Sequence, residues 1–97
     1  MADLHPAAQR ELWEAIEHYE GAVPGLGLEF LESVERATNL LAAHPEAGER
    51  YRIGRIEVRR WPLERFPFIL VYDLRPGVVV VAVAHTSRKP GYWAHRI

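Results

Sequence analysis

The fold can be worked out from residues Phe66–Arg96, which read FPFILVYDLRPGVVVVAVAHTSRKPGYWAHR. Two apolar runs, Phe66–Leu74 and Val78–Ala84, are rich in β-branched and aromatic residues and are separated by a three-residue Arg-Pro-Gly segment. Such runs joined by a short loop that contains glycine predict a β-hairpin. Both runs carry apolar side chains on both faces, so the rest of the chain must cover at least one face. We expect this hairpin to form the core.

The composition changes directly after this hairpin. Residues 85–96 read HTSRKPGYWAHR, a dense mixture of polar, basic and aromatic side chains. A plain hydrophobic core requires little of this chemistry. We therefore expect the activity of the protein to lie in this C-terminal tail.

Two amphipathic helices are predicted upstream of the hairpin. Apolar residues recur at helical spacing over Pro6–Glu20, with proline at the first helical position and Gly21 as the expected stop. A second helix is predicted over Gly27–Ala43, ended by His44 and Pro45. The two helices form an antiparallel pair whose apolar stripe needs a sheet to cover.

A third strand is predicted over Ile56–Trp61, where apolar and charged residues alternate. The alternation places Arg55, Glu57 and Arg59 on a common face. If Ile56 and Val58 face the helices, the arginines lie on an exposed surface of the sheet. Residues 45–51 are expected to form a polar loop, and the first five residues could add a short edge strand.

The predicted fold is α+β: an N-terminal helical hairpin packed on one face of a small antiparallel sheet, in a single domain over residues 1–97. The expected core residues are those that share the apolar faces of these elements, namely Leu12, Ile16, Phe30, Leu31, Val34, Leu41, Ile69, Val71, Val80 and Ala82.

The bulk composition narrows the class of protein. The chain has 97 residues, of which 48% are hydrophobic and 26% charged, as in an ordinary globular domain. Its longest apolar run, Val78–Ala84, is far too short to cross a bilayer, and no signal peptide is expected. Cysteine is absent, which excludes disulfides. We expect a cytoplasmic protein that does not contact a membrane.

The net charge of -1 conceals a strong asymmetry. Residues 1–50 carry three basic against ten acidic groups, a net of -7, whereas residues 51–97 carry nine against three, a net of +6. Lys89 is the only lysine, and arginine suits bidentate contact with phosphate or carboxylate. Internal ion pairs with the acidic helices explain part of this pattern. The remainder indicates an anionic partner, either nucleic acid or an acidic protein segment.

The sequence contains no glycine-rich phosphate loop, no metal-ligand spacing and no serine nucleophile motif, so we expect neither a metal nor a cofactor. His85 ends a strand just before the aromatic tail. It either takes part in the activity of the protein or holds the tail in place by a hydrogen bond. Tyr92 and Trp93 are either packing anchors for a short terminal helix or stacking platforms for bases.

Several of these residues together resemble a known family, the RelE/ParE superfamily of toxins from bacterial type II toxin-antitoxin systems. The order RFPF, then VAVAH, then RKPGYW carries the resemblance, supported by Arg59, Tyr72 and Arg96 and, upstream, by GLGLEF and the His44-Pro45 pair. The resemblance covers nearly the whole chain and looks closer to the ParE, or plasmid-stabilisation, branch.

The resemblance implies a small toxin that is held inactive by a cognate antitoxin. RelE-like members are ribosome-dependent endoribonucleases that cut mRNA, whereas ParE-like members poison DNA gyrase and arrest growth. RelE-like nucleases use lysines in the strand region, and this chain has none before Lys89. Gyrase inhibition is therefore the favoured expectation. The alternatives are mRNA cleavage and a non-toxic binding module of the same fold, which leaves open whether the chain is an enzyme.

The candidate site residues follow from these alternatives. A metal-free nuclease needs a base, an acid and cations around the scissile phosphate, and the set that would supply them is Arg65, His85, Arg88 and Tyr92. Binding to a target or to the antitoxin instead requires the arginine and aromatic types that dominate binding hot spots, and the residues expected to do so are Arg59, Arg65, Arg88, Tyr92, Trp93 and Arg96.

Overall fold

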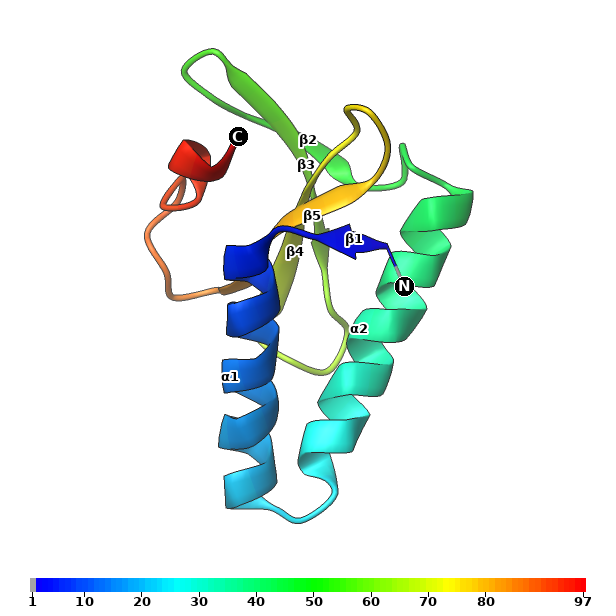
Figure 1. The fold of residues 1–97 in the computed structure, drawn as a ribbon, viewed down its shortest axis with the longest axis vertical. Helices are drawn as coiled ribbons and strands as arrows, with labels where there is room; N and C mark the ends of the chain where they lie inside the picture. Colours follow the sequence, from blue (N-terminus) through cyan, green and yellow to red (C-terminus); the bar gives the residue numbers. More distant parts are fainter. Residues whose placement is uncertain (1) are drawn as a thin grey trace.

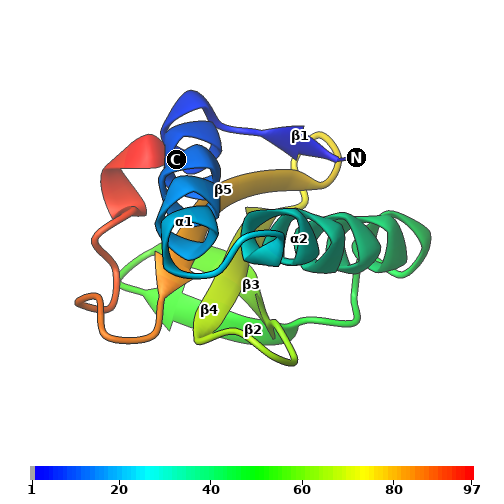
Figure 2. The ribbon, with the colours of Figure 1, turned by 90° about the horizontal axis from the view of Figure 1, so that it is seen from below.

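The structure, a computed structural model, describes residues 2–97. Two helices form a hairpin over one face of a five-stranded sheet whose strands lie in the order β1-β5-β4-β3-β2 (Figures 1 and 2). The predicted α+β fold with its helical hairpin is confirmed. The elements are β1 (Asp3–Leu4), α1 (Pro6–Ala22), α2 (Leu26–Ala43), β2 (Glu49–Ile53), β3 (Ile56–Pro62), β4 (Phe68–Asp73), β5 (Val79–His85) and the short 3-10 helix η1 (Ala94–Arg96).

Both helices lie where the sequence predicts them, but Gly21 does not end α1. The helix continues to Ala22, and the left-handed residue of the turn is Gly25, with φ of 90°. Glu20 explains this, because its carboxylate accepts hydrogen bonds from the backbone N–H groups of Gly25 and Gly27. One side chain at the end of α1 thus satisfies donors at the start of α2 that the helix itself leaves unpaired.

Strand β2 was not predicted from the sequence. A polar loop was expected over residues 45–51, and this expectation is wrong from Glu49 onward. Strand β2 pairs antiparallel with β3, with Arg50 opposite Arg59 and Ile53 opposite Ile56. Gly54 supplies the positive φ, 58°, that a two-residue hairpin turn requires at its first position. The alternation of charged and apolar residues in this strand is short, and it lies next to a true loop, which concealed it.

The sheet is mixed rather than wholly antiparallel. Strand β1 pairs parallel with β5, whereas the other neighbouring strands pair antiparallel. The short N-terminal edge strand that the sequence allowed is therefore present from Asp3 to Leu4; Met1 lies outside the described residues. Because β1 has only two residues, it covers only the first part of the β5 edge.

The sheet is buried on both faces, in two separate hydrophobic clusters. The helix-side cluster combines the apolar stripes of α1 and α2 with Leu70, Tyr72 and Val80. The tail-side cluster lies on the opposite face, where Trp93 packs against Val58 and Val71. The helices therefore bury one face of the sheet, and the C-terminal tail buries part of the other.

The predicted core residues are all buried or packed against the core, but those of the sheet lie on both of its faces. Leu12, Phe30, Val34 and Leu41 are buried as expected, and Ile16 and Leu31 pack partly buried against them. The strand residues divide, because Val80 faces the helices whereas Ile69, Val71 and Ala82 lie in the tail-side cluster.

A β-bulge explains this division. Val71 pairs with Ala82, but the next residue, Tyr72, pairs with Val80, so Val81 is an extra residue in β5. The alternation of faces is interrupted at this point. Both phases of the run are apolar, so the sequence alone does not reveal the interruption.

Strand β3 also does not turn Ile56 and Val58 toward the helices, which is the orientation that would expose its arginines on the opposite face of the sheet. Ile56 and Val58 lie in the tail-side cluster, not against the helices. Their charged neighbours Glu57 and Arg59 consequently lie on the helix side of the sheet, the same side as Tyr72, with which Arg59 pairs. The helices do not extend over this part of the sheet.

We expect adjacent leucines of α2 to respond very differently to truncation. Leu41 is 0% exposed, whereas Leu40 is 39% exposed. Leu41→Ala should lower the free energy of unfolding by about 2–5 kcal/mol, because it removes buried methyl groups and leaves a cavity. Leu40→Ala is the matched control and should change it by less than about 0.5 kcal/mol. Urea denaturation measures both, and equal effects would show that the buried face of α2 is assigned wrongly.

Candidate functional site

The C-terminal tail, residues 86–97, leaves the end of β5 and returns along the side of α1 to finish in η1 (Figure 1). Trp93 anchors it, with only 3% of its surface exposed, and its ring lies edge-on to Tyr51 of β2 at 6.2 Å between centroids. Of the two readings of Trp93 that the sequence left open, the structure thus shows a packed anchor.

A carboxylate from α1 holds the end of the tail. Arg96 forms a bidentate ion pair with Glu11, at 2.9 Å from Nη1 to Oε1 and 3.0 Å from Nη2 to Oε2. The Tyr92 hydroxyl donates to Glu11 Oε2 at 2.8 Å. The side chains of Arg96 and Glu11 are only 9% and 14% exposed. We call Glu11, Tyr92 and Arg96 the Glu11 cluster.

The Glu11 cluster also closes the part of the β5 edge that β1 leaves uncovered. Glu11 Oε1 accepts from the backbone N–H of Val83 at 3.0 Å, and Arg96 Nη1 donates to the carbonyl of Val81 at 2.9 Å. A strand edge with free donors and acceptors is a template for unwanted pairing. Side chains here satisfy the groups that a neighbouring strand would otherwise pair.

The pKa values of both Tyr92 and Arg96 are raised in the Glu11 cluster. Burial raises the pKa of Tyr92, and the hydrogen bond to Glu11 and its negative charge raise it further. The hydrogen bond to Glu11 raises the pKa of Arg96. Tyr92 is therefore a neutral hydrogen-bond donor at physiological pH and is poorly suited to give up its proton.

His85 lies at the exposed end of β5, where the tail begins. Its Nδ1 accepts a hydrogen bond from the backbone N–H of Ser87 at 3.0 Å and lies 2.8 Å from the Ser87 hydroxyl oxygen. Its ring packs edge-on to Phe68. An amide donor at Nδ1 requires a free lone pair there, so the neutral ring carries its proton on Nε2.

The remaining predicted site residues fall into different environments. Arg88 stacks on the ring of Tyr92, with its guanidinium 3.9 Å from the centroid, and lines a hollow of about 260 Å³ with His85 and His18. Arg65, in the β3–β4 loop, pairs with Glu29 of α2 at 2.8 Å. The structure thus brings His85, Arg88 and Tyr92 together, while Arg65 is held by the second helix.

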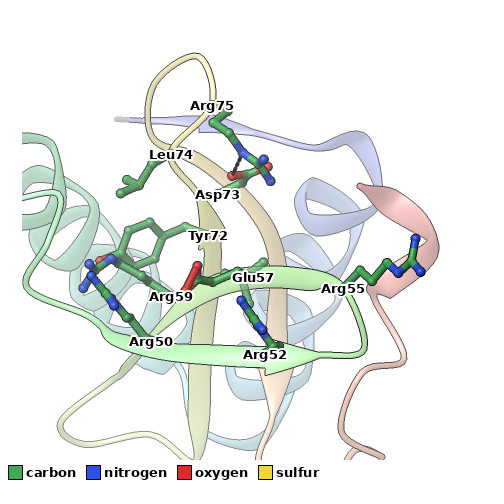
Figure 3. A pocket seen from close by; sticks show the side chains of 10 residues that line it. Arg50, Arg52, Arg55, Glu57, Arg59, Tyr72, Asp73, Leu74 and Arg75 are labelled. Atoms are coloured by element: carbon green, nitrogen blue, oxygen red, sulfur yellow. Dashed lines mark hydrogen bonds and ion pairs between the residues drawn. The ribbon is translucent and has the colours of Figure 1, made fainter.

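Arg59 belongs to a second site, which we call the arginine hollow. This hollow, of about 420 Å³, lies on the helix side of the β2–β3 hairpin (Figure 3). Arg59 is held there through Nη1, which donates to the backbone carbonyls of Glu46 and Gly48. The charged residues that line it are Arg50, Arg52, Arg55, Glu57, Arg59, Asp73 and Arg75.

Sequence reasoning missed Glu11 and most of the arginine hollow, for different reasons. Glu11 is one of several glutamates on α1, and no local signal separates it from the others, because its partners lie 72 to 85 positions away. Arg50 and Arg52 did carry a signal, their alternation with Tyr51 and Ile53. The loop predicted over residues 45–51 includes only the first half of this pattern, and four residues are too few to indicate a strand.

The described part of the chain contains neither a metal-ligand cluster nor a membrane-spanning helix. Within residues 2–97, no group of three or more His, Cys, Asp or Glu side chains is arranged to hold a metal ion. None of the helices in this part of the chain is both long and apolar enough to cross a membrane.

We expect Glu11 to be critical for the stability of the tail. Glu11→Gln leaves the buried Arg96 charge without its carboxylate, and breaking a buried pair on one side costs on the order of 3–5 kcal/mol. Amides of residues 92–97 should exchange hydrogen faster, and the urea midpoint should fall. Glu14→Gln, an exposed glutamate one turn away, is the control and should leave both unchanged. Equal exchange rates in the two variants would contradict this role.

Comparison with known proteins gives one clear result. The family model described as "ParE toxin of type II toxin-antitoxin system, parDE" matches residues 2–90, which include both helices and all five strands. No curated protein gives a significant match. The match extends over far more than half of the chain, so this protein belongs to the ParE toxin family of type II toxin-antitoxin systems.

Proposed function

We propose that this toxin inhibits DNA gyrase by binding it and is neutralised by a cognate acidic antitoxin. The observation that carries the proposal is the Glu11 cluster, because it uses Tyr92 and Arg96 to hold the fold together. The chain belongs to the ParE family. The resemblance noted in the sequence implies gyrase poisoning for this branch. Inhibition by binding demands a shaped surface and no catalytic chemistry.

Cleavage of RNA would make greater demands on these residues. Such a reaction needs a proton acceptor, a proton donor and cations around one phosphate. Tyr92 has a raised pKa and a hydroxyl already bound to Glu11, and Arg65 is paired with Glu29. Only His85 and Arg88 of the proposed nuclease set remain exposed without a carboxylate partner among the described residues.

The surface that we propose for the target lies where the tail leaves the sheet. Arg88 is exposed, yet its stacking on Tyr92 orders it, so little side-chain entropy is lost when it binds. His85 lies beside it, and Arg65 is exposed on the neighbouring β3–β4 loop. Arginine in an ordered, partly apolar setting is a frequent hot spot of protein interfaces.

The other candidate binding residues support this surface indirectly. Trp93 and Arg96 are too buried to present their side chains to a partner, but they fix the position of the tail that carries Arg88. The antitoxin in turn would neutralise the toxin by covering Arg65 and Arg88. Contacts between arginine and carboxylate favour an acidic antitoxin segment and accelerate its association.

Gyrase inhibition can be tested with purified components. The chain should inhibit gyrase supercoiling or trap gyrase-cleaved DNA, and Arg88→Gln should raise the concentration required by at least about tenfold, the loss expected for a hot spot. Arg10→Gln, which removes an exposed arginine of α1, is the matched control and should act like the wild type.

A parallel assay on ribosome-bound mRNA separates the alternatives. We expect no cleavage. Cleavage that disappears in His85→Ala or Arg65→Ala would replace the gyrase proposal with the nuclease function. Growth arrest in cells with neither activity in vitro would refute both mechanisms while leaving the toxin role intact.

Binding of the antitoxin should depend on salt. If Arg65 and Arg88 contact carboxylates, the association rate should fall as the ionic strength rises, because exposed charges are screened. Surface plasmon resonance with the cognate antitoxin measures the rate. A double variant, Arg65→Gln with Arg88→Gln, should lose most of the salt dependence, whereas Arg10→Gln should keep it. An association rate that is the same at low and high salt would contradict this electrostatic account.

A further inference from the structure

The arginine hollow presents charged side chains from a single face of a two-stranded ribbon. In strand β2, Arg50 and Arg52 are two residues apart and therefore project from the same face. Opposite them lie Arg59 and Glu57 of β3. Figure 3 shows these side chains on the helix side of the β2–β3 hairpin, with Arg75 of the β4–β5 loop lying against Asp73 at the edge of the hollow.

Most of these guanidinium groups are free to bind a ligand. Arg50, Arg52 and Arg55 are exposed, and their side chains form no hydrogen bond or ion pair with any other residue in the range 2–97. Arg75 has a contact of only 3.4 Å with Asp73, and its side chain is 74% exposed. An exposed pair of this kind contributes little and is readily exchanged for a ligand.

We propose that the arginine hollow binds the phosphate backbone of double-stranded DNA, independently of base sequence. Five arginines against two carboxylates give the hollow a net positive charge, although the whole chain has a net charge of -1. Arginine forms bidentate hydrogen bonds with phosphate oxygens. Neither this hollow nor a nucleic-acid ligand is part of the gyrase proposal, and the inference does not depend on that target.

The spacing of the arginines favours a regular, rigid polyanion. Residues two apart in a strand are separated by roughly 6.6–6.8 Å, and successive phosphates on one DNA strand rise about 3.4 Å along the helix axis. Arg50 and Arg52 are therefore far enough apart to meet two different phosphates of one strand. Because the hydrogen-bonded β2–β3 ladder fixes this spacing, binding a rigid duplex requires little reordering of the backbone.

The surroundings of the hollow favour a duplex over single-stranded nucleic acid. Binding of single strands relies on exposed aromatic rings on which bases stack. Among the described residues that line the hollow, Tyr72 is the one aromatic residue, and it is fully buried, with its hydroxyl bonded to Pro45 and Gly48. A two-stranded β-ribbon also has dimensions that a DNA groove accepts. The acidic N-terminal half of the chain would orient the ribbon toward the duplex by repulsion.

The test measures binding of the full chain to a short fluorescein-labelled DNA duplex by fluorescence anisotropy over a series of salt concentrations. If Arg50, Arg52, Arg55 and Arg75 each meet a phosphate, the logarithm of the binding constant should fall against the logarithm of salt concentration with a slope of about -3.6. The double variant Arg50→Gln with Arg52→Gln should reduce the slope to about -1.8.

Two further variants make the result specific. Glu57→Gln removes a carboxylate that faces Arg52 across the ribbon, so it should tighten binding. Arg36→Gln removes an exposed arginine of α2 outside the hollow and should bind as the wild type does. Circular dichroism melting of every variant confirms that the fold is retained.

The proposal is overturned by any of three results. The first is an absence of DNA binding by the wild type at low salt. The second is an unchanged slope in the double arginine variant. The third is stronger displacement of the labelled duplex by poly-glutamate than by unlabelled DNA at equal charge concentration, which would assign the hollow to an acidic protein segment instead.

Discussion

The fold depends on the carboxylate of Glu11, which joins three parts of the chain. It receives two hydrogen bonds from Arg96, one from the Tyr92 hydroxyl and one from the backbone of Val83 in β5. A buried ion pair stabilises a protein only if further hydrogen bonds offset the cost of removing the charges from water. Glu11 meets this condition, because its two oxygens receive four donors. The result is a rigid link between α1, the open edge of β5 and the tail.

This link explains why the second face of the sheet is covered at all. The helices cover one face, and residues 2–97 contain no further α-helix for the other. The tail covers it instead, with the buried Trp93 placed against Val58 and Val71 and the partly buried Tyr92 beside it. The dense mixture of polar and aromatic residues after β5 is thus largely structural. The part that we propose to be functional is smaller, and it lies where His85 and Arg88 reach the surface.

The unequal cover of the sheet also separates the two charged sites. Strand β2 contributes no residue to the helix-side cluster, so its helix-side face remains open and carries Arg50 and Arg52. Arg88 belongs to the tail at the end of β5. A toxin must engage a target and also be recognised by an antitoxin. If the proposals above hold, two separate basic surfaces would allow the antitoxin to cover one while the other remains accessible to DNA.

The sequence by itself determined the elements with strong local signals. The helical period placed α1 and α2, and the two apolar runs around Pro76 and Gly77 placed the β4–β5 hairpin. The residue types of the tail, together with the helical and strand motifs, were enough to indicate the toxin family. These properties are local, because each depends on residues within one or two turns or one hairpin of each other.

The tertiary structure alone decided which face each strand residue occupies and what the tail does. The faces of β4 and β5 could not be predicted, because both phases are apolar and a bulge at Val81 changes the phase. The role of Glu11 could not be predicted either, since it depends on a contact with Arg96, 85 positions away. Such contacts arise from the docking of whole elements, and no local pattern in the sequence records them.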